Sequence, residues 1–288
     1  MYAVVGATGN TGRAVVKELR GLGEDPLCIV RSADKARAVL GAAVKTATAD
    51  LDDRSGMEKA LAGAKRVFLV TGHNPKCAEQ QINVIEAAKA AGAEYVVKVS
   101  GGRDVVGPKV ESLSGRAHHQ IEEHLRTCRL QWCVLSPGLF MQNLLGQAEN
   151  IKKGSKIAQP WPKDLPVALI DVRDTGALGA RVLREPGRHA GKTYSFTGFS
   201  TSFGAVARAL SEVLGKPIGY DELTIEQAEA AMKARGLPEW LIAHLSAIAR
   251  AVRSGAFSKE HTQPIRNIVG RPSTSARQFI EDYRDAFA

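Results

Sequence analysis

Residues 1–12 read MYAVVGATGNTG, a short apolar run that leads into glycines at positions 6, 9 and 12. A helical pattern follows directly, with Val15, Leu19 and Leu22 spaced to share one side. A strand, a glycine turn and a helix in this order present backbone N–H groups and the positive end of a helix dipole to a pyrophosphate. The order favours a dinucleotide site over a merely tight turn, with these contacts: Gly6, Thr8, Gly9, Asn10, Thr11 and Gly12.

The residue after the second apolar run indicates which dinucleotide binds. The run covers residues 27–30 and ends about 20 positions past the glycines, where NAD-binding folds place an acid for the ribose 2′-hydroxyl. Here the residue is Arg31, whose guanidinium suits a 2′-phosphate, and Lys35 adds a positive charge one helical turn later. The alternative is that both are solvated surface charges. The sequence therefore predicts NADPH (NADP) as the cofactor in preference to NAD(H).

Strands and helices alternate up to residue 136. Strands are expected at 1–5, 27–30, 44–49, 66–70, 95–100 and 131–136, with helical patterns between them. Buried, valine-rich strands joined by helices favour an α/β fold with a doubly wound parallel sheet that is covered on both faces. We therefore predict an NAD(P)-binding Rossmann domain over residues 1–140.

After residue 140 the pattern changes. Loops rich in Pro, Trp and Lys lead into helical patterns at 203–214, 225–235 and 240–253. These features predict a smaller, mostly helical C-terminal domain over residues 141–288, on the substrate side of the molecule. Part of residues 170–195 can instead return to the Rossmann domain.

Composition excludes several classes of protein. Hydrophobic residues make up 44% of the 288, but no stretch approaches the ~20 apolar residues that span a bilayer. The first residues already form the first expected strand, so we expect a cytoplasmic protein without a signal peptide or membrane segment. The four cysteines form no Cys-x-x-Cys pair, and we expect them to be reduced core thiols.

The formal charge of +9 suits an anionic partner. Lysine and arginine are spread along the chain without a basic block, so nucleic-acid binding is not required. Attraction of an anionic cofactor or substrate is the simpler use of this charge. No combination of His, Cys and Asp has metal-ligand spacing, so no metal site is predicted.

The carboxyl ends of the expected strands supply further candidates, because ligands of open α/β sheets lie there. Asp50 offers a carboxylate for the adenine amino group, and Leu51 offers an apolar cover for the ring. The alternative at each strand end is ordinary turn chemistry, since Gly, Ser, Thr and Pro are common there. We predict substrate contact at Gly102 and cofactor contacts at Thr71, Gly72, His73, Ser100, Gly101, Pro137, Gly138 and Leu139.

Several motifs together resemble a known family. Ser114 and His118 share a face of a predicted helix, and Glu122 follows one turn later. With GATGNTG at 6–12, Val-Arg at 30–31, PGLFMQN at 137–143, DVRD at 171–174 and SGAFS at 254–258, they resemble atypical short-chain dehydrogenases/reductases of the NmrA-like branch. Within that branch the chain is most similar to the quinone oxidoreductase and triphenylmethane reductase group. The resemblance covers essentially the whole chain.

The chain departs from the superfamily at its acid pair. Most members carry Tyr-x-x-x-Lys, in which the phenol protonates a carbonyl and the lysine holds the ribose. Here Ser114 and His118 occupy those positions, and a serine hydroxyl is no acid at neutral pH, so simple ketone chemistry is disfavoured. We expect His118 to hold the nicotinamide ribose or the substrate, or to donate a proton. The alternative is a solvated helix face, because His119 and His124 share the helix.

The resemblance and this departure together predict the function. We expect an NADPH-dependent oxidoreductase whose acceptor takes hydride without concurrent protonation, such as a quinone, a cationic dye or another conjugated aromatic electrophile. The candidate pocket residues, which also suit a hydrophobic core, are Phe140, Met141, Asn143, Trp161 and Trp240.

Two alternative functions stay open. The first is an NADP(H)-binding redox sensor without turnover, as some NmrA-like regulators are, and loss of the Tyr-x-x-x-Lys pair suits it. The second is a reductase of secondary metabolism, which differs only in its substrate. The assembly is open between a monomer and a homodimer.

Overall fold

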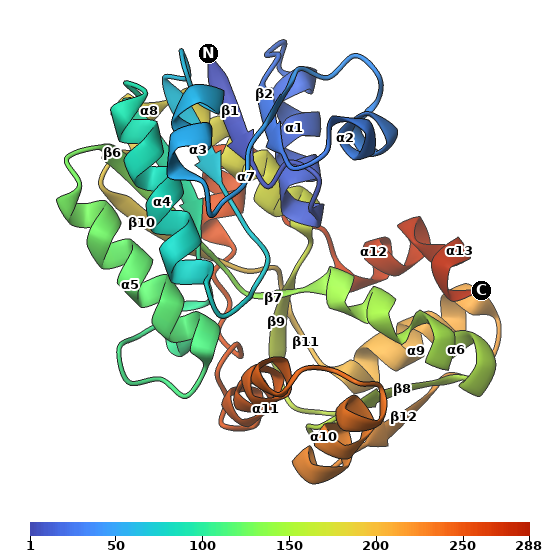
Figure 1. The fold of residues 1–288 in the computed structure, drawn as a ribbon. Helices are drawn as coiled ribbons and strands as arrows, with labels where there is room; N and C mark the ends of the chain where they lie inside the picture. The colour runs from blue at the N-terminus through green and yellow to red at the C-terminus, as the bar shows by residue number, and fades with distance from the viewer.

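A seven-stranded parallel sheet forms the centre of the molecule in this computed structural model, which describes residues 1–288. The strand order is β10-β6-β5-β4-β1-β2-β3, with helices on both faces (Figure 1). This arrangement confirms the predicted doubly wound α/β fold. The strands are β1 (Tyr2–Val5), β2 (Leu27–Val30), β3 (Thr46–Thr48), β4 (Arg66–Leu69), β5 (Tyr95–Val99), β6 (Gln131–Pro137) and β10 (Lys192–Phe196).

The six expected strands are all present, and the structure adds β10 as a seventh. β3 is shorter than the expected 44–49, because it is an edge strand that pairs only with β2. β10 reads KTYSF, and its polar residues suit the other edge of the sheet, where it pairs only with β6. β10 begins within residues 170–195, the segment that we expect to belong in part to the Rossmann domain, and it ends one residue beyond it. The boundary at residue 140 stays a prediction.

Two hydrophobic cores cover the two faces of the sheet. On one face lie α1 (Asn10–Gly21), α7 (Val172–Arg184) and the π-helical η3 (Ile265–Val269), with Leu19, Leu178 and Ile265 in the core. On the other lie α3 (Arg54–Ala60), α4 (Cys77–Ala90) and α5 (Leu113–Thr127). All four cysteines are buried and free, which confirms the expected core thiols.

The C-terminal region has its own core and lies below the sheet in Figure 1. It is mostly helical, as predicted, but it also contains two small sheets, β11-β9-β7 and β12-β8. Strands of two to four residues carry too few positions for a pattern in the sequence. The elements of this region are β7 (Leu139–Phe140), η2 (Met141–Gln147), α6 (Ala148–Gly154), β8 (Lys156–Gln159), β9 (Val167–Ile170), β11 (Ser200–Thr201), α9 (Phe203–Leu214), β12 (Gly219–Glu222), α10 (Ile225–Ala234), α11 (Glu239–Arg253), α12 (Ala276–Asp282) and α13 (Arg284–Phe287).

Three short elements complete the chain's secondary structure. They are α2 (Ala33–Leu40) beside β2 and β3, η1 (Arg103–Val105) after β5, and α8 (Pro186–His189) before β10. No helix of the protein is both long enough and apolar enough to cross a membrane.

Candidate functional site

The three glycines after β1 differ in why a side chain is absent from each position. Gly6 has φ +80°, and a Cβ there would overlap the carbonyl oxygen of Val70 on the neighbouring strand end. A Cβ on Gly12 would overlap the carbonyl oxygen of Gly6. A Cβ on Gly9 would meet only Gly6 O, at 3.4 Å, so packing within the chain does not require glycine there. Gly6 and Gly12 are therefore needed for the conformation and packing of the turn. Gly9 leaves the outer surface of the turn without a side chain, and we call this surface bare.

Helix α1 begins at this turn without a capping side chain. Gly9 is its N-cap residue, and no acidic residue lies in the first turn. By contrast, Ser32, Ser112 and Ser202 cap α2, α5 and α9 through their hydroxyl groups. The first N–H groups of α1 are thus left to an external acceptor, and a helix N-terminus of this kind favours an anion. This bare cradle fits a pyrophosphate.

Two exposed cations stand beside the turn. β1 and β2 are adjacent parallel strands, so their carboxyl ends share one edge of the sheet. Arg31 follows β2 directly, and Lys35 lies in the first turn of α2. Neither side chain forms an ion pair or a hydrogen bond within the chain, because only the backbone N–H of Lys35 is used, toward Ser32. Both charges are free to meet a 2′-phosphate.

The candidates after β3 and β4 lie at the same edge. Asp50 is exposed, and its carboxylate accepts the N–H of Asp52 at 2.9 Å. Leu51 packs against the core beside α4. Thr71 accepts a hydrogen bond from Gln81 at 2.8 Å, whereas Gly72 is exposed. The chain therefore already uses Asp50, Leu51 and Thr71 in part, whereas Gly72 is exposed and can contact a ligand.

The candidates after β5 and β6 are more closely packed. The Ser100 hydroxyl donates to Glu122, and the backbone N–H of Gly138 donates to the carbonyl of Phe196 at 2.9 Å. A Cβ on Gly102 would strike the ring of Phe257, at 2.7 Å from Cε1. Gly101, Pro137 and Leu139 lie in the same stretch of the edge, and Leu139 begins β7.

Glu122 is a buried, ionised carboxylate. Arg103 and Arg126 each donate to its Oε2 at 2.9 Å. Burial raises the pKa of Glu122, but the hydrogen bonds from Arg103 and Ser100 outweigh it and hold the pKa below its ordinary value. The carboxylate thus fastens α5 to η1 and to the end of β5, and it is no proton donor at neutral pH.

Four basic side chains converge next to this carboxylate, and we call them the basic cluster: Lys98, His118, His73 and His244. Lys98 lies in β5 with none of its surface exposed, and its Nζ is 3.0 Å from Nδ1 of His118. The exposed ring of His73 lies 5.8 Å from the His118 ring and 5.1 Å from the His244 ring, measured between centroids. His244 comes from α11, so this helix closes over the sheet edge.

Burial sets the protonation of the cluster. It lowers the pKa of Lys98 to about 7, against the opposing charge of Glu122. Burial, followed by the charge of Lys98, lowers the pKa of His118 well below its ordinary value. Burial, followed by His73, lowers the pKa of His244 to about 4. At neutral pH the His118 and His244 rings are uncharged, and Lys98 is present in both its charged and its neutral form.

Helix α5 carries two of the residues singled out in the sequence. Ser114 and His118 are both buried on its inner face, with 3% and 5% of their surfaces exposed. His118 therefore does not belong to a solvated face, whereas His119 is only partly buried and His124 pairs with Glu86 at 2.9 Å. The Ser114 hydroxyl is buried and has no hydrogen-bond partner within the chain. An unpaired buried hydroxyl on the same helix face as His118 suits a site built for a polar ligand.

Sequence reasoning missed Lys98 and His244. The signal for Lys98 was present, because it is the one charged residue in the buried run YVVKV of β5. A buried lysine without a carboxylate partner is rare and marks a functional site more often than a structural one. His244 carried no comparable signal, since a histidine on an amphipathic helix is unremarkable.

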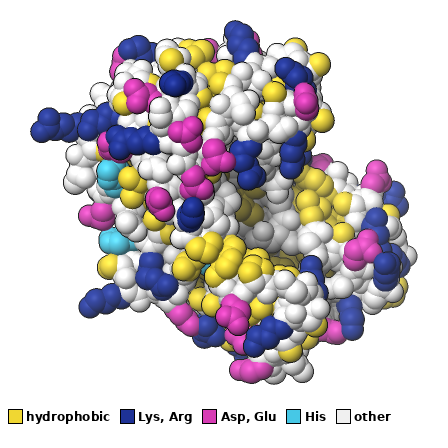
Figure 2. Space-filling model, viewed as in Figure 1, with side chains coloured by type: hydrophobic (Ala, Val, Ile, Leu, Met, Phe, Trp, Pro, Cys, Tyr) yellow, Lys and Arg dark blue, Asp and Glu magenta, His cyan; other side chains and the backbone are white.

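The aromatic and apolar candidates for a substrate pocket do not all meet. Met141 and Trp161 belong to the core of the C-terminal region, where the Trp161 ring packs 5.4 Å from Phe203. Phe140 packs against the core on the α1 face, Asn143 is exposed, and Trp240 lies partly buried at the start of α11. Figure 2 shows a hollow between the sheet domain and the C-terminal region, with hydrophobic side chains gathered on its rim over α11.

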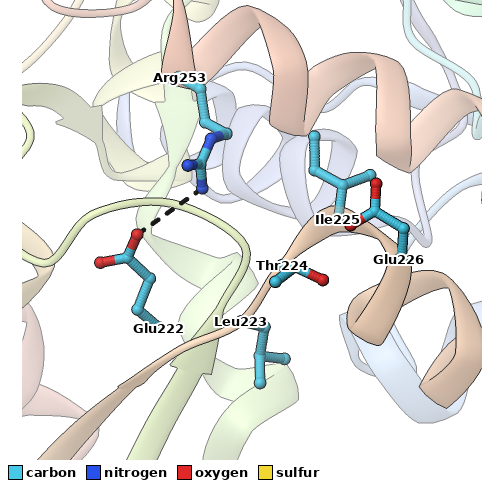
Figure 3. Close-up of a pocket in the computed structure, with 6 residues that line it drawn as sticks. All are labelled: Glu222, Leu223, Thr224, Ile225, Glu226 and Arg253. Atoms are coloured by element: carbon cyan, nitrogen blue, oxygen red, sulfur yellow. Dashed lines mark ion pairs between the residues drawn. The ribbon is translucent and has the colours of Figure 1, made fainter.

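A separate pocket of about 420 Å³ lies within the C-terminal region, at the junction of β12, α10 and α11. Figure 3 shows Arg253 pointing toward Glu222, at 3.8 Å, with Glu226 on the opposite side. Two carboxylates in six lining residues oppose the phosphates of a dinucleotide. No group of three or more His, Cys, Asp or Glu side chains in the protein has the arrangement of a metal site.

Comparison with known proteins agrees with this geometry. A model of the NmrA-like family matches residues 2–271. An NAD(P)H azoreductase of Xenophilus azovorans is 32% identical over 290 residues, covering 100% of this chain and 99% of that protein. A (4-alkanoyl-5-oxo-2,5-dihydrofuran-3-yl)methyl phosphate reductase of Streptomyces griseus is also 32% identical, with the same coverage. The structure of an NADPH-dependent quinone oxidoreductase of Escherichia coli complexed with NADPH is 26% identical, covers 99% of this chain and 100% of that chain, and has a TM-score of 0.86.

Proposed function

This chain belongs to the NmrA-like family and, like its azoreductase and quinone oxidoreductase relatives, is an NAD(P)H-dependent oxidoreductase; we propose that it transfers hydride from NADPH to a quinone or another conjugated aromatic electrophile. The observation that carries the proposal is the pairing of two sites at one sheet edge. One is a bare phosphate cradle with free cations beside it, and the other is a basic cluster without a tyrosine acid.

Each part of the cofactor has matching residues in the chain. The turn at 6–12 holds the pyrophosphate through backbone N–H groups, and Arg31 with Lys35 holds the 2′-phosphate. Asp50 and Leu51 border the adenine. The nicotinamide end lies toward β5 and β6, near the following residues: Thr71, Gly72, His73, Ser100, Gly101, His118, Pro137, Gly138 and Leu139. When bound, NADPH supplies a hydride to the acceptor.

The basic cluster favours an acceptor that becomes an anion. Hydride addition to a quinone leaves a hydroquinone monoanion, whose negative charge the Lys98 ammonium stabilises across the His118 ring. The hollow beside α11 offers apolar surface to a flat aromatic ring. Gly102, which follows β5, and Trp240, at the start of α11, are candidates for substrate contact.

A turnover assay tests the proposal and its alternatives. NADPH oxidation is followed by absorbance against a panel of quinones, cationic dyes and enones, while NADPH affinity is measured in parallel. We expect turnover of at least one acceptor, and His118→Ala should lower kcat/KM about 10- to 100-fold while His119→Ala has little effect. Tight NADPH binding without any turnover would instead favour the redox sensor. Turnover restricted to enones would favour a reductase of secondary metabolism.

A further inference from the structure

Lys98 is a buried charge that makes no ion pair and to which cofactor binding gives no role. Its whole surface is covered, and the groups within hydrogen-bond distance of Nζ are His118 Nδ1 at 3.0 Å and the carbonyl of Val99 at 3.3 Å. The nearby carboxylate of Glu122 is taken by Arg103, Arg126 and Ser100. A buried ammonium without its own carboxylate lowers stability, so its retention calls for a function.

We propose that Lys98 is a positioning residue that fixes the tautomer of His118 and passes a proton through His118 to the reduced acceptor. The inference rests on the proposed function and adds to it the proton donor that the missing tyrosine would have supplied. It depends on the contact between Nζ of Lys98 and Nδ1 of His118.

The contact determines which ring nitrogen carries a proton. An ammonium has only donors, so Nδ1 of His118 accepts and Nε2 holds the ring proton. Nε2 has no hydrogen-bond partner within the chain, and its neighbour Cδ2 would lie 3.3 Å from a Cβ on Gly101. Because residue 101 is glycine, the Nε2–H edge faces the strand ends uncovered. The imidazole therefore presents a donor to the place where the acceptor is expected.

The proton balance of the step closes within the pair. Hydride addition to a quinone forms a C–H or O–H bond and leaves one negative charge on the acceptor, which is reduced while NADPH is oxidised. Nε2 gives its proton to the oxyanion, and Nδ1 takes a proton from Nζ of Lys98. Lys98 becomes a neutral amine, and His118 is uncharged before and after the step. Solvent then returns one proton to Nε2, and the proton on Nδ1 goes back to Nζ.

The surroundings keep Lys98 ready to release a proton near neutral pH. Burial lowers the pKa of Lys98 to about 7, so both its charged and neutral forms are populated there. His118 stays uncharged at this pH, which suits a relay that never stores charge on the ring. The titratable and charged groups that face the pair come from the strand ends, α4, η1, α5 and α11: His73, Cys77, Arg103, Glu122, Arg126 and His244.

Two acceptors separate a proton relay from a structural role. Reduction of a naphthoquinone needs a proton on the product, whereas a cationic triarylmethane dye becomes a neutral product by taking hydride alone. We expect Lys98→Gln to lower kcat with the quinone about 100-fold and to change kcat with the dye by less than about twofold. In the wild type, kcat with the quinone should fall as pH rises above about 7, since Lys98 must be protonated. That limb should disappear in Lys98→Gln.

Lys98→Met serves as the second variant, and NADPH titration with thermal melting controls both. Each variant removes a buried charge, so both should fold and bind NADPH as the wild type does. Equal losses of kcat with both acceptors, or an unchanged pH limb, would overturn the relay and leave Lys98 a structural residue. Failure of the wild type to reduce either acceptor would overturn the proposed function itself.

Discussion

The phosphate turn and the basic cluster lie at the same sheet edge but are built in opposite ways. The turn consists of glycines and uncapped backbone N–H groups, and none of its residues 6–12 is titratable. The basic cluster consists of four titratable side chains from four parts of the chain, three of them buried. The turn can bind a phosphate because it leaves backbone N–H groups uncovered by side chains. The cluster instead depends on side chains whose pKa values burial has lowered.

This difference separates binding from chemistry. A change in the turn removes space or backbone donors for a phosphate, so it should alter NADPH affinity at every pH. A change in the cluster alters charge and proton position, so it should alter rate and pH dependence at nearly constant affinity. A variant of the turn that changes only the pH dependence of the rate, or a variant of the cluster that changes only NADPH affinity, would contradict this comparison.

The largest effect is expected from Gly9→Val. The side chain would fill the bare side of the turn where the pyrophosphate lies, and NADPH binding should be lost. The fold should persist, because Gly9 has φ −77° and a Cβ there makes only an ordinary contact, at 3.4 Å from Gly6 O. Fluorescence titration with NADPH and thermal melting measure the two properties. The pH dependence of stability should stay as in the wild type, because the turn contains no titratable residue.

Gly12→Val is the matched control for this variant. Its Cβ would overlap the carbonyl oxygen of Gly6, so it should lower the melting temperature as well as binding. If Gly9→Val still titrates with wild-type affinity, the phosphates lie elsewhere. If both variants unfold, Gly9 is needed for the fold as Gly12 is, and its proposed role in phosphate binding alone is wrong.

The two regions also differ in how far the sequence predicted them. The turn lies within twelve consecutive residues between a strand and a helix, so its geometry follows from local spacing. The same holds for the sheet, whose inner strands are mainly apolar. The edge strand β10 was missed because KTYSF carries polar residues that only an edge tolerates.

The basic cluster required the tertiary structure. His73 and His118 were expected near the site from their places at a strand end and on a helix face. The contact of His244 with Ser112, at 3.1 Å, joins residues 132 positions apart, and nothing in the local pattern of α11 predicts it. Lys98 looks like part of an apolar strand, and only the fold shows that its Nζ reaches His118. Sites made of side chains from separate elements depend on packing that periodicity does not encode.

The next largest effect is on acid stability, to which His244 of the cluster contributes and the turn does not. The folded state holds His244 uncharged, with a pKa lowered from 6.5 to about 4, while the unfolded chain protonates it readily. Below pH 6.5 the unfolded state therefore binds more protons, and stability falls with pH. His244 alone should cost on the order of 3 kcal/mol of unfolding free energy between pH 6.5 and 4. Urea unfolding at a series of pH values measures this loss.

His244→Asn should flatten this dependence, because asparagine offers Ser112 a hydrogen bond without a titratable ring. His119→Asn, on the partly buried side of α5, is the matched control and should leave the slope unchanged. If the unfolding free energy of His244→Asn depends on pH as in the wild type, the folded state does not hold His244 uncharged.

The smallest effect is expected from Arg31→Ala, which tests whether the cation beside the turn binds the 2′-phosphate. The guanidinium is exposed and unpaired, so its removal should leave the fold intact and cost only its contact with the 2′-phosphate. NADPH affinity should fall about 10- to 100-fold, while NADH affinity, which lacks that phosphate, should hardly change. Because the contact lies in solvent, the preference for NADPH in the wild type should shrink as ionic strength rises. Arg37→Ala is the matched control, since Arg37 lies on α2, the helix that follows Arg31, but already pairs with Asp34 at 3.0 Å. Equal losses of affinity for NADPH and NADH would show that Arg31 stabilises the turn and does not recognise the 2′-phosphate.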